Sequence, residues 1–190
     1  MKIVFYLIAM VCIVISCSKS ISPYEKYVDT YEGTYLLDSV EWHGANNGLD
    51  INGDGQATSD FFGEMKSLFC WQALSDQYKF ICDMHCHNYI FAVRFPILVC
   101  KMSGDNNEPL FMDCWIQDAL MNFYLDSEGQ VTLYNVKQDF DTMSLGQYGA
   151  RVNEVEFQDG LVYYKVDATV YDFVSRGLVS GEIVFTYSRK

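Results

Sequence analysis

The chain has 190 residues, of which half are hydrophobic and 16% are aromatic, and it contains only three prolines. This composition excludes a disordered stalk and predicts one folded domain, because a chain of this length buries about 70% of the surface of its unfolded form. The formal net charge of −12 disfavours nucleic acid and anionic lipid head groups as partners. Metal cations and neutral ligands remain possible.

The N-terminus begins with one basic residue, Lys2, and the uncharged apolar run Ile3–Ile15. As a helix this run would rise about 20 Å, whereas the hydrocarbon core of a membrane is about 30 Å thick. The pattern therefore predicts an export signal rather than a spanning helix.

The apolar run ends in Val14, Ile15, Ser16 and Cys17, which resembles the lipobox of bacterial lipoproteins. The resemblance implies that residues 1–16 are a signal peptide and that Cys17 receives the lipid. It also implies that residues 17–30 tether the domain to the bacterial cell envelope, with the outer membrane as the expected location and its face undecided. The alternative is an ordinary secretory signal followed by an incidental cysteine.

Residues 31–190 are predicted to form one mainly β domain. The apolar residues there are β-branched or aromatic, and turn signals recur at intervals of roughly ten to fifteen residues. The expected strands span residues 33–42, 77–83, 88–101, 110–116, 121–126, 131–136, 152–158, 161–171 and 181–188. Tight turns are expected at residues 126–129 and at the Asp159-Gly160 pair, since Asp-Gly tolerates the positive φ angles of a two-residue hairpin turn.

One helix is expected, from Asp60 to about Leu74. Phe61 and Met65 fall on its apolar face, together with Leu68 and Phe69, while Glu64 and Lys66 fall off that face. A single helix among antiparallel strands favours a meander that closes into an up-and-down barrel, with a β-sandwich as the alternative.

The order of these segments carries a family resemblance. The strand Gly33–Trp42, an acidic Asp-x-Asn-x-Asp-Gly loop and a helix follow one another, and this layout resembles lipocalin-like domains of bacterial lipoproteins. Tyr35 stands where lipocalins usually carry tryptophan. The resemblance implies a barrel and no particular ligand.

The acidic loop, residues 50–60, places oxygen side chains at alternate positions around a glycine turn, which is typical of calcium loops of the EF-hand type. Position 12 of such a loop would be Phe61, so closure has to come from another residue: Asp60 is the first choice, and Thr58, Ser59 and Glu64 are weaker options. The predicted ligands of a structural Ca²⁺ are Asp50, Asn52, Asp54, Gln56 and Asp60. The alternative is an acidic surface turn in which Asp60 only caps the helix.

A second cluster, Cys82 to His87, contains two cysteines and two histidines. On a continuous strand Cys82 and Cys86 would lie about 13 Å apart, so a zinc site would need a tight turn there, and buried or disulfide-bonded cysteines are the preferred interpretation. Cys70, Cys82, Cys86, Cys100 and Cys114 form an odd set whose pairing the sequence leaves open.

No catalytic motif is recognisable, and scattered carboxylates such as Asp118, Glu154 and Asp172 are interpreted as solvated outer faces. The leading hypothesis is therefore a non-catalytic domain that binds a small apolar molecule or a glycan, using tyrosines such as Tyr163, Tyr164 and Tyr171. The second hypothesis is a structural or interaction subunit that contacts another envelope protein and has no ligand cavity. An unrecognised enzyme is the third.

Overall fold

In the part of the chain that the structure describes, the alternating apolar pattern folds into eight antiparallel strands, which two short helices accompany. The computed structural model describes residues 23–68, 78–84, 89–103, 109–134 and 150–189, so the predicted signal peptide and Cys17 lie outside the described residues. The elements are α2 (Pro23–Tyr31), β1 (Gly33–Gly44), α3 (Phe61–Ser67), β2 (Lys79–Asp83), β3 (Ile90–Met102), β4 (Pro109–Leu125), β5 (Val131–Tyr134), β6 (Ala150–Gln158), β7 (Leu161–Asp172) and β8 (Gly177–Arg189).

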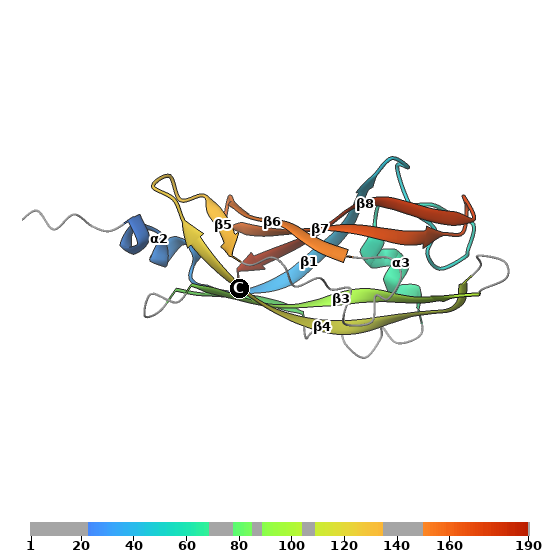
Figure 1. Ribbon diagram of the computed structural model, residues 1–190, viewed down its shortest axis with the longest axis horizontal. Coiled ribbons are helices and arrows are strands. Elements are labelled where there is room, and N and C mark those ends of the chain that lie inside the picture. The colour runs from blue at the N-terminus through green and yellow to red at the C-terminus, as the bar shows by residue number, and fades with distance from the viewer. Residues whose placement is uncertain (1–22, 69–77, 85–88, 104–108, 135–149, 190) are drawn as a thin grey trace, which may run out of the picture.

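The strands form one sheet in the order β5-β4-β3-β2-β1-β8-β7-β6, and every neighbouring pair is antiparallel. Pairing of β1 with β8 joins the two ends of the chain and curls the sheet into a nearly closed barrel, with β5 and β6 as its two edges (Figure 1). The prediction of a mainly β meander with one helix after the first strand is confirmed. Neither helix in the described ranges is long and apolar enough to cross a membrane.

Both predicted turns are present. Asp159 and Gly160 have φ angles of 52° and 79° and connect β6 to β7, as expected for a two-residue hairpin with positive φ at both positions. In the β4–β5 turn, Gly129 has φ of 86° and the carboxylate of Asp126 accepts hydrogen bonds from the amides of Glu128 and Gln130 at 2.8 and 2.9 Å. These turns fix the register of the strands they connect.

Two predicted boundaries are wrong. The strands expected at residues 110–116 and 121–126 are parts of one continuous strand, β4, because the residues between them include neither glycine nor proline and continue the alternation. The helix expected to reach Leu74 ends at Ser67, where Leu68 takes up an extended conformation with ψ of 140°.

Helix α2 was not expected, since its residues were interpreted as tether. It begins at a proline, which is favourable at the first position of a helix. Tyr27 and Tyr31 stack on each other at 5.5 Å, and Tyr31 stacks on Phe157 of β6 at 4.4 Å. The hydroxyl of Tyr35 donates to the carbonyl of Tyr31 at 2.9 Å. Tertiary contacts therefore stabilise this nine-residue helix, which would be marginal alone.

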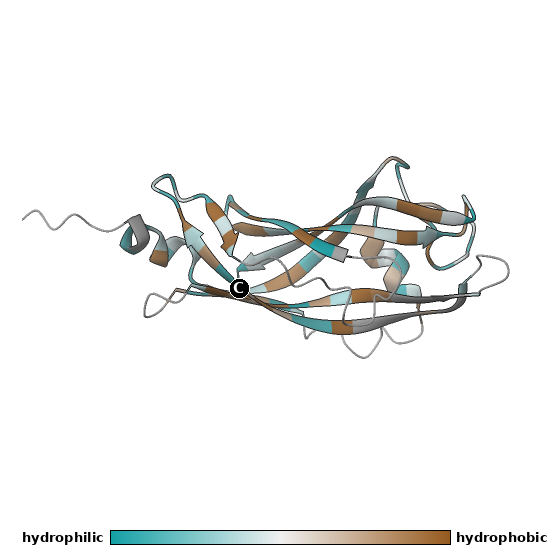
Figure 2. Ribbon diagram, in the orientation of Figure 1, coloured by the Kyte–Doolittle hydropathy of each residue, from teal (hydrophilic) through white to brown (hydrophobic). Residues whose placement is uncertain are grey.

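Among the described residues, aromatic side chains pack against one another inside the barrel. Phe91 and Phe123 are stacked with ring centroids 3.8 Å apart, and Phe80 lies 4.9 Å from Phe91 and 5.7 Å from Tyr187. Figure 2 shows the alternation of apolar and polar residues along the strands that produces this inward face. The described core residues extend from Val28 to Tyr187, so residues 18–190 include all of them.

Candidate functional site

The acidic loop is organised around Asp50, whose side chain is buried with 1% of its surface exposed. One carboxylate oxygen of Asp50 accepts hydrogen bonds from the amides of Gly53 and Asp54 at 2.7 and 3.2 Å, and the other accepts from the amide of Gly55 at 2.9 Å. Gly53 and Gly55 have φ angles of 78° and 86°, a conformation that favours glycine. The first residue of the predicted calcium loop thus determines the path of the next five.

Asn52 and Asp54 follow on the exposed side of the loop. Asn52 Oδ1 accepts from the amide of Asp54 at 2.8 Å, and Asp54 Oδ1 accepts from the amide of Gln56 at 2.8 Å. The side-chain amide of Asn52 also approaches Asp54 Oδ2 at 3.4 Å. The structure therefore brings Asp50, Asn52 and Asp54 together in one turn, and Gln56 joins them through its backbone.

Asp60 lies elsewhere. It is the N-cap of α3, and its carboxylate accepts a hydrogen bond from the amide of Gly63 at 2.8 Å. The carboxylate that reaches the loop belongs to Glu64, one turn further along α3. Glu64 Oε2 accepts from the amides of Ile51 and Asn52 at 3.2 and 3.4 Å. The prediction that Glu64 lies off the buried face of this helix is wrong, since only 5% of its surface is exposed.

Asp172 also contacts the loop, although its sequence context predicts a solvated carboxylate. Asp172 ends β7 and is buried; its Oδ1 accepts from the amide of Asp50 at 2.9 Å and its Oδ2 from the amide of Ser175 at 2.9 Å. The amide of Phe173 in turn donates to the carbonyl of Asp50 at 2.8 Å. These bonds attach the loop to the β7–β8 connection, 122 residues away in sequence, a separation that no local motif could reveal.

The pKa values of the two buried acids Glu64 and Asp172 are shifted in opposite directions. Burial raises the pKa of Glu64; hydrogen bonds from Ile51 and Asn52 oppose the shift, and the charges of Asp54 and Asp50 add to it. Burial also acts to raise the pKa of Asp172, but hydrogen bonds from Ser175 and from the amides of Asp50 and Val174 outweigh it and lower that pKa. In the described part of the chain, no basic side chain forms an ion pair with these acids.

The donor set suits a hard cation in kind, because it consists of carboxylate and amide oxygens. Among the described residues, however, no three His, Cys, Asp or Glu side chains are grouped as a metal site. An ion bound here would need the amide oxygen of Asn52 or backbone carbonyls in addition to the carboxylates of Asp50 and Asp54.

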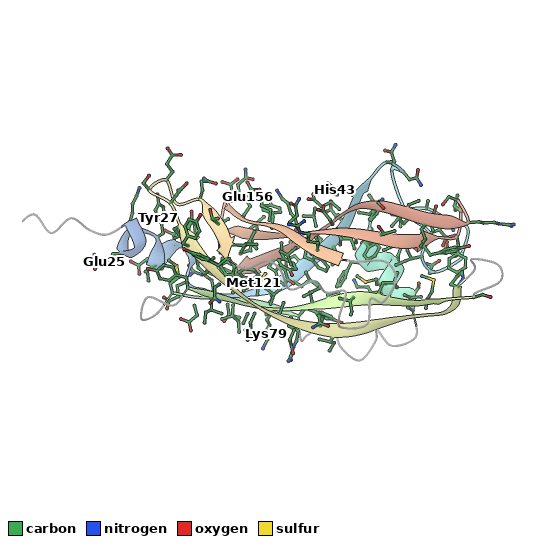
Figure 3. All side chains as sticks on the ribbon, viewed as in Figure 1. Glu25, Tyr27, His43, Lys79, Met121 and Glu156 are labelled. Atoms are coloured by element: carbon green, nitrogen blue, oxygen red, sulfur yellow. The ribbon has the colours of Figure 1, made fainter. Side chains whose placement is uncertain are left out.

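A second feature is a groove on the outer face of β2, β3 and β4, with a volume of about 390 Å³. The strand register sets two adjacent rows of side chains there. In order across β2, β3 and β4, the charged row consists of Lys79, Arg94 and Asp118. The apolar row consists of Ile81, Ala92 and Leu120. Figure 3 shows Lys79 on the outside of this layer, whereas Met121 lies within the barrel.

The charged row contains an ion pair. Arg94 donates through Nε and a terminal nitrogen to the two carboxylate oxygens of Asp118 at 2.7 and 2.9 Å. This hydrogen-bonded pairing lowers the pKa of Asp118. The sequence predicts Asp118 on a solvated outer face but does not indicate its partner, because Arg94 is 24 residues away.

The other residues singled out by sequence do not converge. Tyr164 is buried in the core, whereas Tyr163 faces the opposite side of β7, as neighbours on a strand must. Glu154 and Glu156 both pair with Lys165, at 2.7 and 2.9 Å. Of the cysteine–histidine cluster, Cys82 is a buried free thiol, and burial raises its pKa to about 12. Residues 85–88 lie outside the described residues.

Comparison of the chain with protein-family models, with curated proteins and with solved structures yields no match.

Proposed function

We propose that this chain is a lipid-tethered, non-catalytic binding module of a bacterial envelope, and that it binds its partner or ligand on the outside of a packed barrel. The observation that carries the proposal is the aromatic cluster of Phe80, Phe91 and Phe123, which occupies space inside the barrel where a lipocalin-type ligand would lie. The groove on the outer face of β2–β4 offers a space in which a ligand could bind.

The tether is tested by metabolic labelling with an alkyne fatty acid in a bacterial host, followed by membrane fractionation. We expect label and membrane association in the wild-type chain and in Cys12→Ser, and loss of both in Cys17→Ser. Cys12 is the matched control because it lies in the same apolar segment. Equal labelling of all three chains would contradict the assignment of Cys17.

The binding mode is tested by native mass spectrometry of residues 18–190 exported without lipid. An organic adduct that survives transfer and protects core amides from hydrogen exchange would favour an internal small apolar ligand or glycan. A bare polypeptide mass, with an envelope protein captured only by the outer face, would favour the interaction-subunit form of the proposal.

We propose in addition that the acidic loop binds a structural Ca²⁺, held by Asp50, Asn52 and Asp54, and that Glu64 rather than Asp60 completes the site. Support comes from the position of the Glu64 carboxylate at the start of the loop. Burial is the main cause of the raised pKa of Glu64, and a cation there would reduce the additional repulsion from Asp50 and Asp54. An ion at a hundred times its dissociation constant would stabilise the fold by about 2.7 kcal/mol.

The test compares thermal unfolding of residues 18–190 in excess Ca²⁺ and in chelator. We expect a calcium-dependent rise in Tm for the wild type and for Asp60→Asn, which keeps the helix cap, and no rise for Glu64→Gln. A rise that Asp60→Asn abolishes and Glu64→Gln leaves unchanged would return the ligand to Asp60. No rise in any chain would refute the site.

A further inference from the structure

The outer groove has a local charge opposite to that of the whole chain. Lys79 pairs with no acidic side chain in the described ranges, and it adjoins Arg94 in the strand register. Because Asp118 is already neutralised by Arg94, the row carries one uncompensated positive charge. The whole chain, in contrast, carries a net charge of −12. At physiological ionic strength, charges more than about 8 Å away are largely screened, so a small anion in the groove responds mainly to this row.

The second row of the groove is apolar and exposed. Leu120 has 66% of its surface exposed and Ile81 has 39%, although both lie on strands whose inward residues are buried. Between them, Ala92 leaves a shallow centre. On β2 the apolar surface ends at Asp83, whereas on β3 the next outward residue is Ile90. On β4 the next outward residue is Asn122, so the apolar path continues only along β3, away from the charged row.

We propose that this groove binds a small amphiphile with an anionic head, such as a medium-chain carboxylate. The head would lie at Lys79 and Arg94, and the hydrocarbon chain would cover Ala92 and Leu120. The volume of about 390 Å³ is at the lower end of the range of small-molecule pockets, about 300–1,000 Å³. Charge complementarity selects the anionic head, and the exposed apolar row selects the chain. This inference rests on the proposed function in one respect, that binding occurs on the outside of the barrel.

The test uses residues 18–190, checked for folding by circular dichroism, and three ten-carbon probes at monomeric concentrations: decanoate, decyl glucoside and decyltrimethylammonium. Backbone amide shifts in nuclear magnetic resonance spectra locate each probe and give its dissociation constant. We expect shifts on β2–β4 and the tightest binding for decanoate. An exposed ion pair is worth up to about 1 kcal/mol, so Lys79→Gln should weaken decanoate binding about two- to fivefold and leave decyl glucoside unchanged.

Two further variants complete the design. Leu120→Ser should weaken decanoate and decyl glucoside alike, by about three- to tenfold, because it removes apolar contact from both. Lys66→Gln, which changes the same charge at an exposed position on α3, should alter neither. Equal affinity for all three probes, or an unchanged decanoate affinity in Lys79→Gln, would overturn the anionic-head assignment.

Failure of the inference and failure of the proposed function give different results. Shifts confined to core residues such as Phe91 and Phe123 would place the ligand inside the barrel and contradict both. No shifts with any probe at millimolar concentration would refute the groove as an amphiphile site and leave the tether and the packed barrel untouched. Shifts on β2–β4 that appear on concentrating the protein without probe would assign the face to a second copy of the chain and would also overturn the inference.

Discussion

Replacement of Asp50 by alanine tests whether the loop is organised by a carboxylate or by a metal. The substitution removes the acceptor of three amides, those of Gly53, Asp54 and Gly55. An amide left without an acceptor in a buried position costs about 1–3 kcal/mol. Gly53, Asp54 and Gly55 are all exposed, but their hydrogen bonds to the buried Asp50 are partly buried, so water replaces only part of what these three amides lose. We therefore expect Asp50→Ala to lower the free energy of unfolding by about 2–4 kcal/mol.

The measurement is urea unfolding of residues 18–190 in chelator, followed by circular dichroism. Asp50→Asn keeps one oxygen acceptor and should cost about half as much. Asp126→Ala is the matched control, because Asp126 accepts two amides in the exposed β4–β5 turn, and we expect a loss below about 1 kcal/mol there. The reasoning is wrong if Asp50→Ala and Asp126→Ala cost the same, or if the cost at Asp50 appears only when calcium is present.

Three other perturbations probe the interior and the buried acid. Phe123→Ala should lower the free energy of unfolding by about 3–5 kcal/mol, since Phe123 is buried and stacked, while Leu120→Ala on the outer face should change it by less than about 1 kcal/mol; equal losses in urea unfolding would argue against a packed interior. Tyr164→Phe should leave stability unchanged or increase it, because the buried Tyr164 hydroxyl has no hydrogen-bond partner among the described residues. A loss above about 1 kcal/mol would reveal a bound water or ligand. Burial raises the pKa of Glu64 above its ordinary value of 4.5, so its ionisation opposes folding, and the free energy of unfolding should fall as pH rises through the raised pKa. In chelator, Glu64→Gln should remove that fall, and an unchanged pH profile would exclude Glu64 as its source.

The strands were predictable because each one shows the alternation of apolar and polar residues within its own sequence. Alternating residues such as Val162, Tyr164 and Val166 are all buried on β7, and a period of two is visible without knowing the partner strand. The Asp159-Gly160 turn is equally local. Helix α2 lacks such evidence: its stability depends on Tyr31 stacking on Phe157, more than a hundred residues away. A segment held by tertiary contacts has no signature in its own residues.

The turn formed by the acidic loop could be predicted from its sequence, but the carboxylates that reach it from other elements could not. The spacing of Asp50, Asn52 and Asp54 indicates the turn that they form. The carboxylate that reaches this turn, however, depends on how far α3 rotates. Asp60 is used as the cap, so the next acidic side chain along the helix, Glu64, faces inward. Helical periodicity predicted that Glu64 lies off the apolar face, because a carboxylate counts as polar in such a pattern. The pattern contains no information about the amides of Ile51 and Asn52, which donate hydrogen bonds to the buried Glu64 carboxylate.

The outer groove shows a stricter limit of sequence reasoning. Lys79, Arg94 and Asp118 share a row only because β2, β3 and β4 pair in one particular register. A slip of one residue in β3 would send Arg94 into the barrel and Val93 outward, since side chains alternate along a strand. That slip is unfavourable because it would move the buried Phe91, which stacks on Phe123, to the outside of the barrel. It would also place the charged Arg94 among the apolar residues of the core. The aromatic residues packed inside the barrel therefore also align the charged row on the outside.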